Sequence, residues 1–150
     1  MSLNERSGLD VKIPVYINLK ENLDLTVEPR VMTKRGYGIT NKLRYLGKNH
    51  KGFFNLSTLY DDESSYRILE SKDLRWSYNL NHSQKISPKT FFNLDSASSG
   101  DPFYLSDLVS FASVLSRTFV LPQKANLYYF GKNILVRAYI FSFKLNNPLS

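Results

Sequence analysis

Cysteine is absent from the 150 residues of this chain, and histidine occurs only twice. The absence of cysteine excludes disulfide bonds, thiolate nucleophiles and cysteine-ligated zinc, and it leaves the redox compartment open. Neither His50 nor His82 has a second histidine at metal-binding spacing, so a surface or hydrogen-bonded role is favoured over a metal site. We therefore expect neither a metal centre nor a cofactor.

Catalytic motifs are also missing. The chain has no Gly-x-Ser-x-Gly elbow and no Walker-type phosphate loop, and its GYG and GKN stretches are typical of simple turns. Asp61, Asp62 and Glu63 are adjacent but lack the ligand spacing of a calcium loop, which favours a solvated loop. We predict that the protein is not an enzyme.

Long hydrophobic runs are missing as well. Nowhere do eighteen consecutive apolar residues occur, and the opening MSLNERSGLDVK has no apolar core of signal-peptide length. Residues 1–10 are predicted to be a disordered segment or linker. By these criteria alone the chain looks cytosolic and soluble. Transmembrane β-strands, however, carry only a weak alternating signal of about ten residues each, so a membrane location stays open.

Aromatic residues are plentiful, with one Trp, ten Tyr and ten Phe. Together with many serines and asparagines they favour strands and turns, so we predict an all-β protein. The formal net charge of +7 suits an anionic partner: nucleic acid, an acidic membrane surface or a phosphorylated glycolipid. No RNP-like pattern occurs and the aromatics fall mostly on apolar alternating faces, so nucleic acid is not the expected partner.

Residues 13–27, IPVYINLKENLDLTV, alternate apolar and polar side chains almost without interruption. A strand of that length would span about 50 Å at roughly 3.3 Å per residue. Globular strands usually cover about 17 to 20 Å. The run is therefore either two strands joined by a bend near Glu21 and Asn22, or one very long strand of a large barrel.

Further alternating runs follow, separated by turns. A tight turn is predicted at 34–36, and a hairpin connection in GKNHKG, where Gly47 and Gly52 are free to take positive φ. The chain is also expected to turn at 83–90 and at 131–133, and loops are expected at 61–73 and 96–102. For residues 105–121 a strand is favoured over a helix. The remaining strands are expected at 37–46, 53–60, 74–82, 91–95, 126–130 and 134–145. About seven or eight strands in an antiparallel up-and-down meander result.

Two of these strands have well-separated faces. Leu74, Trp76, Tyr78 and Leu80 alternate with Arg75, Ser77, Asn79 and Asn81. In the last strand, one face carries Leu135, Tyr139, Phe141, Phe143 and Leu145, interrupted only by Arg137. Alternation alone does not distinguish a lipid-facing surface from the core of a soluble sandwich.

Four stretches, in order, resemble the LptD family of LPS-assembly proteins (organic solvent tolerance proteins). IPVYINLKENLDLTVEPRVMTKRG is similar to the opening barrel strands of that family, LRYL to its Phe-Arg-Tyr-Leu strand, RWSYNLNH to its Arg-Trp strand ending in His, and DPFYLSDL to its Ser-Asp-x-x-Tyr-x-x-Asp-Leu segment. The matching residues of the first stretch are Pro14, Tyr16, Asn18, Asn22, Asp24, Thr26, Pro29, Arg35 and Gly36.

The resemblance implies a partial segment, residues 11–150, of a large outer-membrane β-barrel that inserts lipopolysaccharide into the outer leaflet through a lateral seam. The implied partners are lipopolysaccharide, an LptE-like plug lipoprotein and periplasmic LPS-transport bridge proteins. The chain lacks the family's periplasmic jellyroll, first barrel strand, signal peptide, cysteines and closing strands, so we interpret it as a fragment of such a protein.

The resemblance also implies roles for particular residues. Pro14 matches one of the prolines that weaken the seam in the family. Such a role is physically sensible, because proline lacks an N–H and removes a ladder hydrogen bond. Pro14 equally suits the simple start of a strand. Arg75, Asn79 and Asn81 are expected to face the lumen. The expected lipid-facing residues are Ile13, Val15, Ile17, Leu74, Trp76, Tyr78 and Leu80. The alternative is a small soluble β-barrel or sandwich that binds a lipid or another anionic ligand, with these apolar residues pointing inward.

Overall fold

The structure is a computed structural model that describes residues 2–4, 7–60, 74–100, 104 and 120–145. The predicted loop at 61–73 lies outside the described residues. So does most of the 105–121 segment, of which only Val120 and Leu121 are described, at the start of a strand. No helix among the described residues has the length and apolarity needed to cross a membrane.

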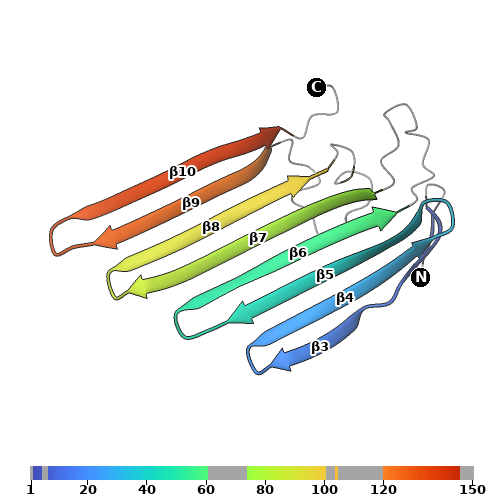
Figure 1. Cartoon of the computed structure of the whole chain (residues 1–150), viewed down its shortest axis with the longest axis horizontal. Coiled ribbons are helices and arrows are strands. Elements are labelled where there is room, and N and C mark those ends of the chain that lie inside the picture. The colour runs from blue at the N-terminus through green and yellow to red at the C-terminus, as the bar shows by residue number, and fades with distance from the viewer. Residues whose placement is uncertain (1, 5–6, 61–73, 101–103, 105–119, 146–150) are drawn as a thin grey trace.

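The described strands form one antiparallel sheet (Figure 1). Its order is β1-β2-β4-β5-β6-β7-β8-β9-β10, and β3 pairs with β4 next to β2. The strands are β1 (Ser2–Asn4), β2 (Gly8–Lys12), β3 (Val15–Lys20), β4 (Leu23–Met32), β5 (Gly36–Leu46), β6 (His50–Tyr60), β7 (Leu74–Ser87), β8 (Thr90–Ser99), β9 (Val120–Phe130) and β10 (Leu135–Leu145). The predicted all-β fold and antiparallel meander are confirmed.

The N-terminal residues are more ordered than predicted. Residues 1–10 were expected to be disordered or a linker, whereas β1 lies within this range and β2 begins in it. The reason is long-range: β2 pairs with β4, with Asp10 opposite Met32 and Lys12 opposite Arg30. Only three residues of each strand pair, and so short a segment shows too little alternation of apolar and polar residues for a strand to be predicted from it.

The long alternating run at 13–27 is a hairpin. β3 and β4 pair with Val15 opposite Val27 and Ile17 opposite Leu25, and the chain turns at 21–22. The first of the two predicted alternatives is therefore correct. The alternation continues through the turn because both strands place their apolar residues on the same face of the sheet.

Two strands extend beyond their predicted ends. β7 continues to Ser87, so the turn that follows it contains only residues 88–89. The serine-rich stretch at 96–99, predicted to be a loop, is the end of β8, where Ser96 pairs with Leu80 and Ser99 with Ser77. Ladder pairing with β7 overrides the turn preference of these serines, since β-propensity depends strongly on neighbouring strands.

Glycine has positive φ at positions other than those expected. Among the described residues, Gly8 (67°) and Gly36 (78°) have positive φ, and Gly47 and Gly52 do not. Gly36 ends the tight turn predicted at 34–36. Gly52 lies inside β6, where an added Cβ would overlap the Tyr45 ring and the Asn81 carbonyl oxygen. Glycine at position 52 thus allows the Tyr45 ring and the backbone of β7 to approach β6 closely.

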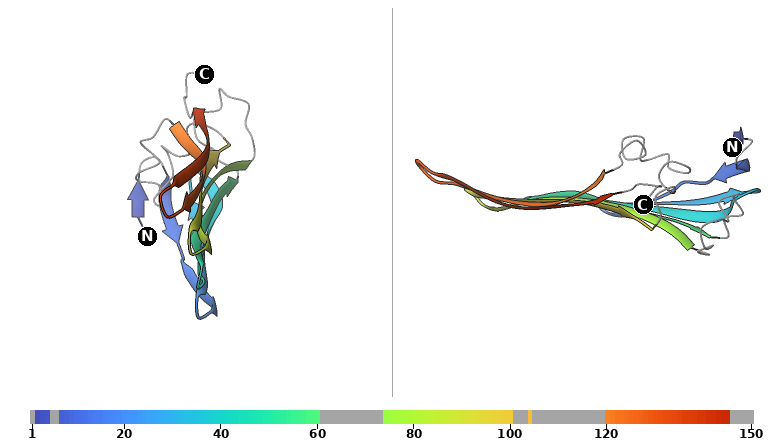
Figure 2. Two further views of the ribbon diagram at one scale, coloured as in Figure 1. Left: turned by 90° about the vertical axis from the view of Figure 1, so that its left-hand side faces the viewer. Right: turned by 90° about the horizontal axis from the view of Figure 1, so that it is seen from above.

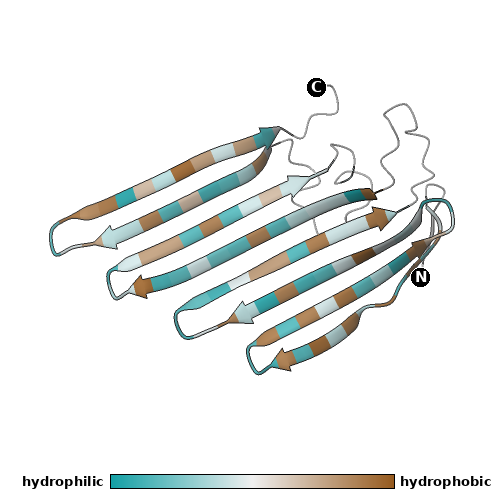
Figure 3. Cartoon of the chain, viewed as in Figure 1, coloured by the Kyte–Doolittle hydropathy of each residue, from teal (hydrophilic) through white to brown (hydrophobic). Residues whose placement is uncertain are grey.

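The register defines two faces of the sheet. We call the apolar face the one that carries the cross-strand row Leu25, Leu43, Phe54 and Leu80, and the polar face the one that carries Thr26, Lys42, Asn55 and Asn79. The sheet is a single curved layer, seen nearly edge-on in the right-hand view of Figure 2. Apolar and polar residues alternate along most strands in Figure 3.

The described part of the sheet has very little interior. Its buried apolar side chains are Met32, Leu59, Ala97, Tyr104 and Leu121, whereas large apolar side chains such as Ile39 and Ile140 are 36% and 76% exposed. The chain exposes 10378 Å². A folded monomer of 17.3 kDa exposes about 7,800 Å² by the usual scaling. The described sheet itself leaves many large apolar side chains exposed on β3, β9 and β10.

An ion pair holds β2 to β4. Arg30 donates to both carboxylate oxygens of Asp10, at 2.9 and 2.7 Å, and the Asp10 side chain is only 8% exposed. The hydrogen bond from Arg30 lowers the pKa of Asp10 below its usual value of 3.8, against the opposing effect of burial. Its contribution to stability is present above that value and is lost as the pH falls through the lowered pKa.

We expect Asp10→Asn to lower the free energy of unfolding by about 1–3 kcal/mol at pH 7, because a charged hydrogen-bonded pair is broken and Arg30 is left half-buried. Urea titrations at pH 7 and at pH 2.5 measure the effect. The difference between wild type and variant should shrink at the lower pH, where wild-type Asp10 is increasingly protonated. An equal difference at both pH values would contradict the assignment.

Candidate functional site

The candidate functional site is the sheet itself, with its two chemically different faces. On the apolar face, the first and last aromatic residues of β5 are Tyr37 and Tyr45, and the stretch from one to the other contains nine residues. The register pairs these two ends with Tyr60 and Gly52 on β6. The paired rows between them are mostly apolar, and they include Ile39, Leu43, Phe54, Leu56, Tyr78 and Leu80. We call this region of β5, β6 and β7 the apolar band.

Aromatic and hydrogen-bonding groups lie at both ends of the apolar band. At one end, Tyr37 and Tyr60 are stacked, with ring centroids 5.6 Å apart. At the other end, the Tyr45 hydroxyl is 2.6 Å from Nδ1 of His82. His82 is thus hydrogen-bonded, in keeping with the role favoured for it from the sequence. Trp76 and Tyr78 stack next to the first end, with ring centroids 6.2 Å apart.

The structure brings the predicted lipid-facing residues together. Val15 and Ile17 lie on the apolar face of β3, and Leu74, Trp76, Tyr78 and Leu80 on that of β7. Ile13 donates its N–H to the Pro29 carbonyl, so it lies opposite Pro29, two residues from the Val15–Val27 pair. Residues two apart on a strand share a face, so Ile13 belongs to the same face as Val15. Arg75, Asn79 and Asn81 lie on the polar face. Whether these faces contact lipid and lumen stays a prediction.

The polar face changes character toward β10. On β10 it carries the aromatic residues whose alternation was noted in the sequence, among them Tyr139 and Phe141, which lie on the same side as Asn79. Cations lie over these rings: Arg137 is 5.3 Å from the centroids of Tyr128 and Tyr139, and Lys124 is 5.5 Å from that of Phe141. The apolar residues of β10 that the sequence grouped together therefore do not continue the apolar face of β7.

Tyr104, which follows β8 in the chain, packs against the polar face of the sheet. Its hydroxyl is 2.8 Å from Oγ of Ser57 on β6, and its side chain is 2% exposed. Ser57 is in turn 3.0 Å from Oγ1 of Thr40 on β5. The Arg75 guanidinium of β7 lies 5.4 Å from the centre of the Tyr104 ring. This tyrosine was quoted within a family motif but was not predicted to contact the sheet.

Pro14 lies at a break in one edge of the sheet. β2 ends at Lys12 and β3 begins at Val15, and both strands pair with β4. Opposite the break is Pro29, whose carbonyl accepts from Ile13 at 3.1 Å but which has no N–H to return. Pro29 therefore removes one hydrogen bond from this ladder, whereas Pro14, one residue after the bonded Ile13, has its nitrogen on the outer side of the edge and removes a donor there. The sequence analysis identified Pro14, but the role of Pro29 depends on a register that the sequence does not reveal.

A hollow of about 270 Å³ lies near the β5–β6 turn. Lys48, Lys51, Lys85, Ser83, Asn93 and Phe91 are among the residues that line it. None of them was singled out from the sequence as a site residue, since only the register brings Lys85 of β7 next to Lys48 and Lys51 at the β5–β6 turn.

Comparison with known proteins identifies relatives over most of the chain, although no family model matches it. The chain is 28% identical over 148 residues to LPS-assembly protein LptD of Ectopseudomonas mendocina, covering 98% of this chain and 16% of that protein. It is 32% identical over 146 residues to the protein of the same name from Cupriavidus pinatubonensis, with 95% and 17% coverage. For that of Nitrosomonas europaea the values are 33% over 123 residues, 82% and 16%. The chain thus spans about one sixth of the length of these relatives.

Proposed function

We propose, from the premise that this chain is homologous to a segment of the LPS-assembly proteins LptD, that it forms part of the wall of an outer-membrane β-barrel that transports lipopolysaccharide. In this proposal the apolar face contacts lipid and the polar face lines the lumen. The ligand class follows from the name of the relatives. The full-length protein would work with an LptE-like plug lipoprotein and periplasmic bridge proteins, as the family resemblance implies.

The observation that carries the proposal is the apolar band. A transmembrane β-strand has about 9–11 residues, and outer-membrane barrels present an apolar belt between two girdles of aromatic residues. The nine residues from Tyr37 to Tyr45 have this length, with Tyr37 and Tyr60 at one end and Tyr45 at the other. The large uncovered apolar surface supports the same interpretation, because lipid is a solvent in which that surface is favourable.

The connections also agree with the proposal. β3–β4, β5–β6, β7–β8 and β9–β10 are all joined by short turns at one end of the sheet (Figure 1). The connections at the other end include the two long ones, between β6 and β7 and between β8 and β9. Outer-membrane barrels have short periplasmic turns and longer extracellular loops. We therefore infer that the end with the short turns faces the periplasm.

The soluble alternative has less support. A small barrel or sandwich would turn the apolar residues of β3 and β7 toward a shared interior. Among the described strands, however, the β1–β3 edge and the β10 edge do not pair with each other, and Val15 and Leu74 are 47% and 38% exposed. An exposed apolar face is favourable against lipid, and the unpaired edges of an open sheet call for further strands that close it into a larger barrel.

The break at Pro14 and Pro29 supports a lateral seam at this edge. Strand separation is easier where ladder hydrogen bonds are missing. At the gap between β2 and β3, Pro29 lacks the N–H that would bond to Ile13, and Pro14 lacks an N–H on the outer side of the edge. We propose that a glycolipid leaves the lumen sideways at this edge in the full-length protein. Pro29 joins Pro14 as a seam residue in this proposal.

Single-cysteine variants at neighbouring positions of β7 test the membrane assignment. The chain contains no cysteine, so each variant reports on one position. After refolding with phosphatidylcholine vesicles, Asn79→Cys should react with a water-soluble maleimide at least tenfold faster than Leu80→Cys. Leu80→Cys should react preferentially with a membrane-soluble maleimide, since adjacent strand residues face opposite sides.

The same pair of variants in urea provides the control, because both cysteines should then react at equal rates with the water-soluble reagent. Recovery of the protein in the supernatant after vesicle flotation, with Leu80→Cys protected from both reagents, would favour the soluble alternative instead.

A further inference from the structure

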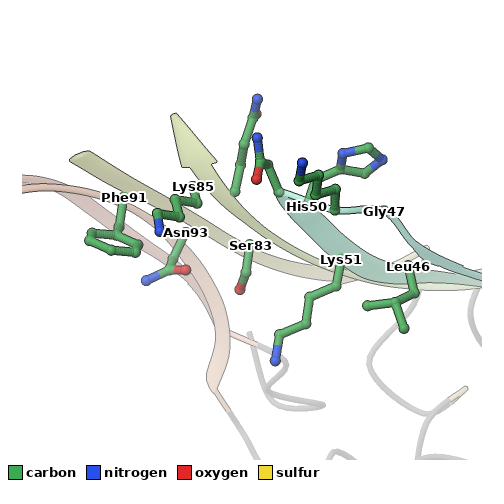
Figure 4. Close-up of a pocket in the computed structure, with 11 residues that line it drawn as sticks. Leu46, Gly47, His50, Lys51, Ser83, Lys85, Phe91 and Asn93 are labelled. Carbon is green, nitrogen blue, oxygen red and sulfur yellow. The ribbon is translucent and has the colours of Figure 1, made fainter. Parts of the chain in front are cut away.

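The hollow beside the β5–β6 turn is lined from four strands, β5 to β8, and that turn. Lys51 of β6 lies opposite Ser83 of β7, and Ser83 lies opposite Asn93 of β8. In Figure 4 the side chains of Lys51, Ser83 and Asn93 extend from the same side of the sheet, whereas His50 lies on the other side. Lys51, Ser83 and Asn93 therefore line the hollow from the polar face, and His50 lines it from the other face.

Positive charge gathers in this hollow without a counter-charge. Lys48, Lys51 and Lys85 are among its lining residues, which include no Asp or Glu. In the part of the chain that the structure describes, no carboxylate comes within the 4.0 Å of an ion pair with any of these lysines. Like charges held together repel one another, and a bound anion relieves that repulsion.

Neutral hydrogen-bond donors stand between the lysines. The Ser83 hydroxyl and the Asn93 amide occupy adjacent strands about 4.8 Å apart, so both can reach one ligand. Lys85 lies over the Phe91 ring, 6.0 Å from its centroid, which holds its ammonium group next to the hollow. Lysine ammonium groups and neutral donors together are suited to the oxygens of a phosphate.

We propose that this hollow is a binding site for a phosphoryl group. The inference rests on the proposed function for the source of that group, which we assign to the phosphorylated sugar of a glycolipid headgroup. The hollow lies at the short-turn end of the sheet, which the proposed function places toward the periplasm, and Lys51, Ser83 and Asn93 line it from the polar face. Lys48, Lys51 and Lys85 thus make first contact with a headgroup that enters the lumen from that side.

Calorimetric titration of the full chain in zwitterionic detergent tests the site with three probes: glucosamine 1-phosphate, inorganic phosphate and glucosamine. The double variant K51Q/K85Q should bind glucosamine 1-phosphate at least tenfold more weakly than the wild type. K51R/K85R, which keeps both charges, should bind within threefold of it. The matched control K20Q/K132Q removes the same charge from exposed positions outside the hollow and should change the affinity less than twofold.

Each result has a defined meaning once far-UV circular dichroism has shown that all variants keep their strand content. Tighter binding of glucosamine 1-phosphate than of inorganic phosphate, with no binding of glucosamine, supports a headgroup site. Equal binding of the two phosphates supports the phosphoryl site and overturns the headgroup as its source. An equal loss in K51Q/K85Q and K20Q/K132Q, or no phosphate binding by the wild type, overturns the site. Vesicle insertion is not measured here, so failure of the proposed function is detected separately.

Discussion

Arginine in place of Leu56 is expected to lower the free energy of unfolding in phosphatidylcholine vesicles by about 2–4 kcal/mol, the cost of a cation at the bilayer midplane on the lipid face of a barrel. Leu56 is the relevant position because it lies in the central row of the apolar band, between Asn41 and Tyr78. The loss corresponds to a decrease of roughly 30- to 1,000-fold in the folding equilibrium constant. Urea titration followed by the fluorescence of Trp76, the single tryptophan, measures it.

The neighbouring variant Asn55→Arg is the matched control. Asn55 is adjacent in the chain but lies on the polar face, opposite Lys42 and Asn79. Its replacement should change the free energy of unfolding by about 0.5 kcal/mol or less, as surface substitutions usually do. If the two arginines cost the same, the two faces of β6 would be in the same environment and the proposed membrane orientation would be wrong.

Truncation of Tyr104 to alanine is expected to destabilise the long-loop end of the sheet by about 3–5 kcal/mol, as for other buried aromatic side chains. The side chain is 2% exposed, bonds to Ser57 and lies under the Arg75 guanidinium, so alanine removes packing, a hydrogen bond and a cation–π contact together. Hydrogen exchange at the backbone amides of β6 and β7 localises the effect, which should be larger near Ser57 than near Lys51.

Tyr104→Phe separates the hydroxyl from the ring. It keeps the packing and removes only the bond to Ser57, so its cost should be about 1 kcal/mol. The exchange rates of the β6 amides should then stay close to those of the wild type. Equal effects of phenylalanine and alanine would mean that the hydrogen bond, rather than the buried ring, fixes Tyr104 on the polar face.

Much of the fold could be predicted from the sequence because alternation is a local signal. The faces of β7 are legible in a single stretch, where Leu74 to Leu80 alternate with Arg75 to Asn81. The tight turn at 34–36 was likewise predicted from local residue types, and Gly36 has the positive φ that such a turn uses. These features depend on neighbours in the chain, which is why the sequence reveals them.

The features that could not be predicted depend on partners far apart in the chain. The order of β2 depends on its pairing with β4 and on the Asp10–Arg30 ion pair, and the strand at Ser96–Ser99 on its pairing with β7. The same holds for the candidate site. Pro29 gains its role from lying opposite the break at Pro14, and the lysine hollow exists only once β6, β7 and β8 are in register.

The two edges of the sheet differ in their ability to template a further strand. β10 offers eleven residues without a proline, and so a continuous row of backbone donors and acceptors. The opposite edge consists of short segments separated at Pro14. Strand addition is therefore expected at the β10 edge rather than at the edge that contains Pro14. Misassembly by strand exchange between copies would begin at the β10 edge for the same reason.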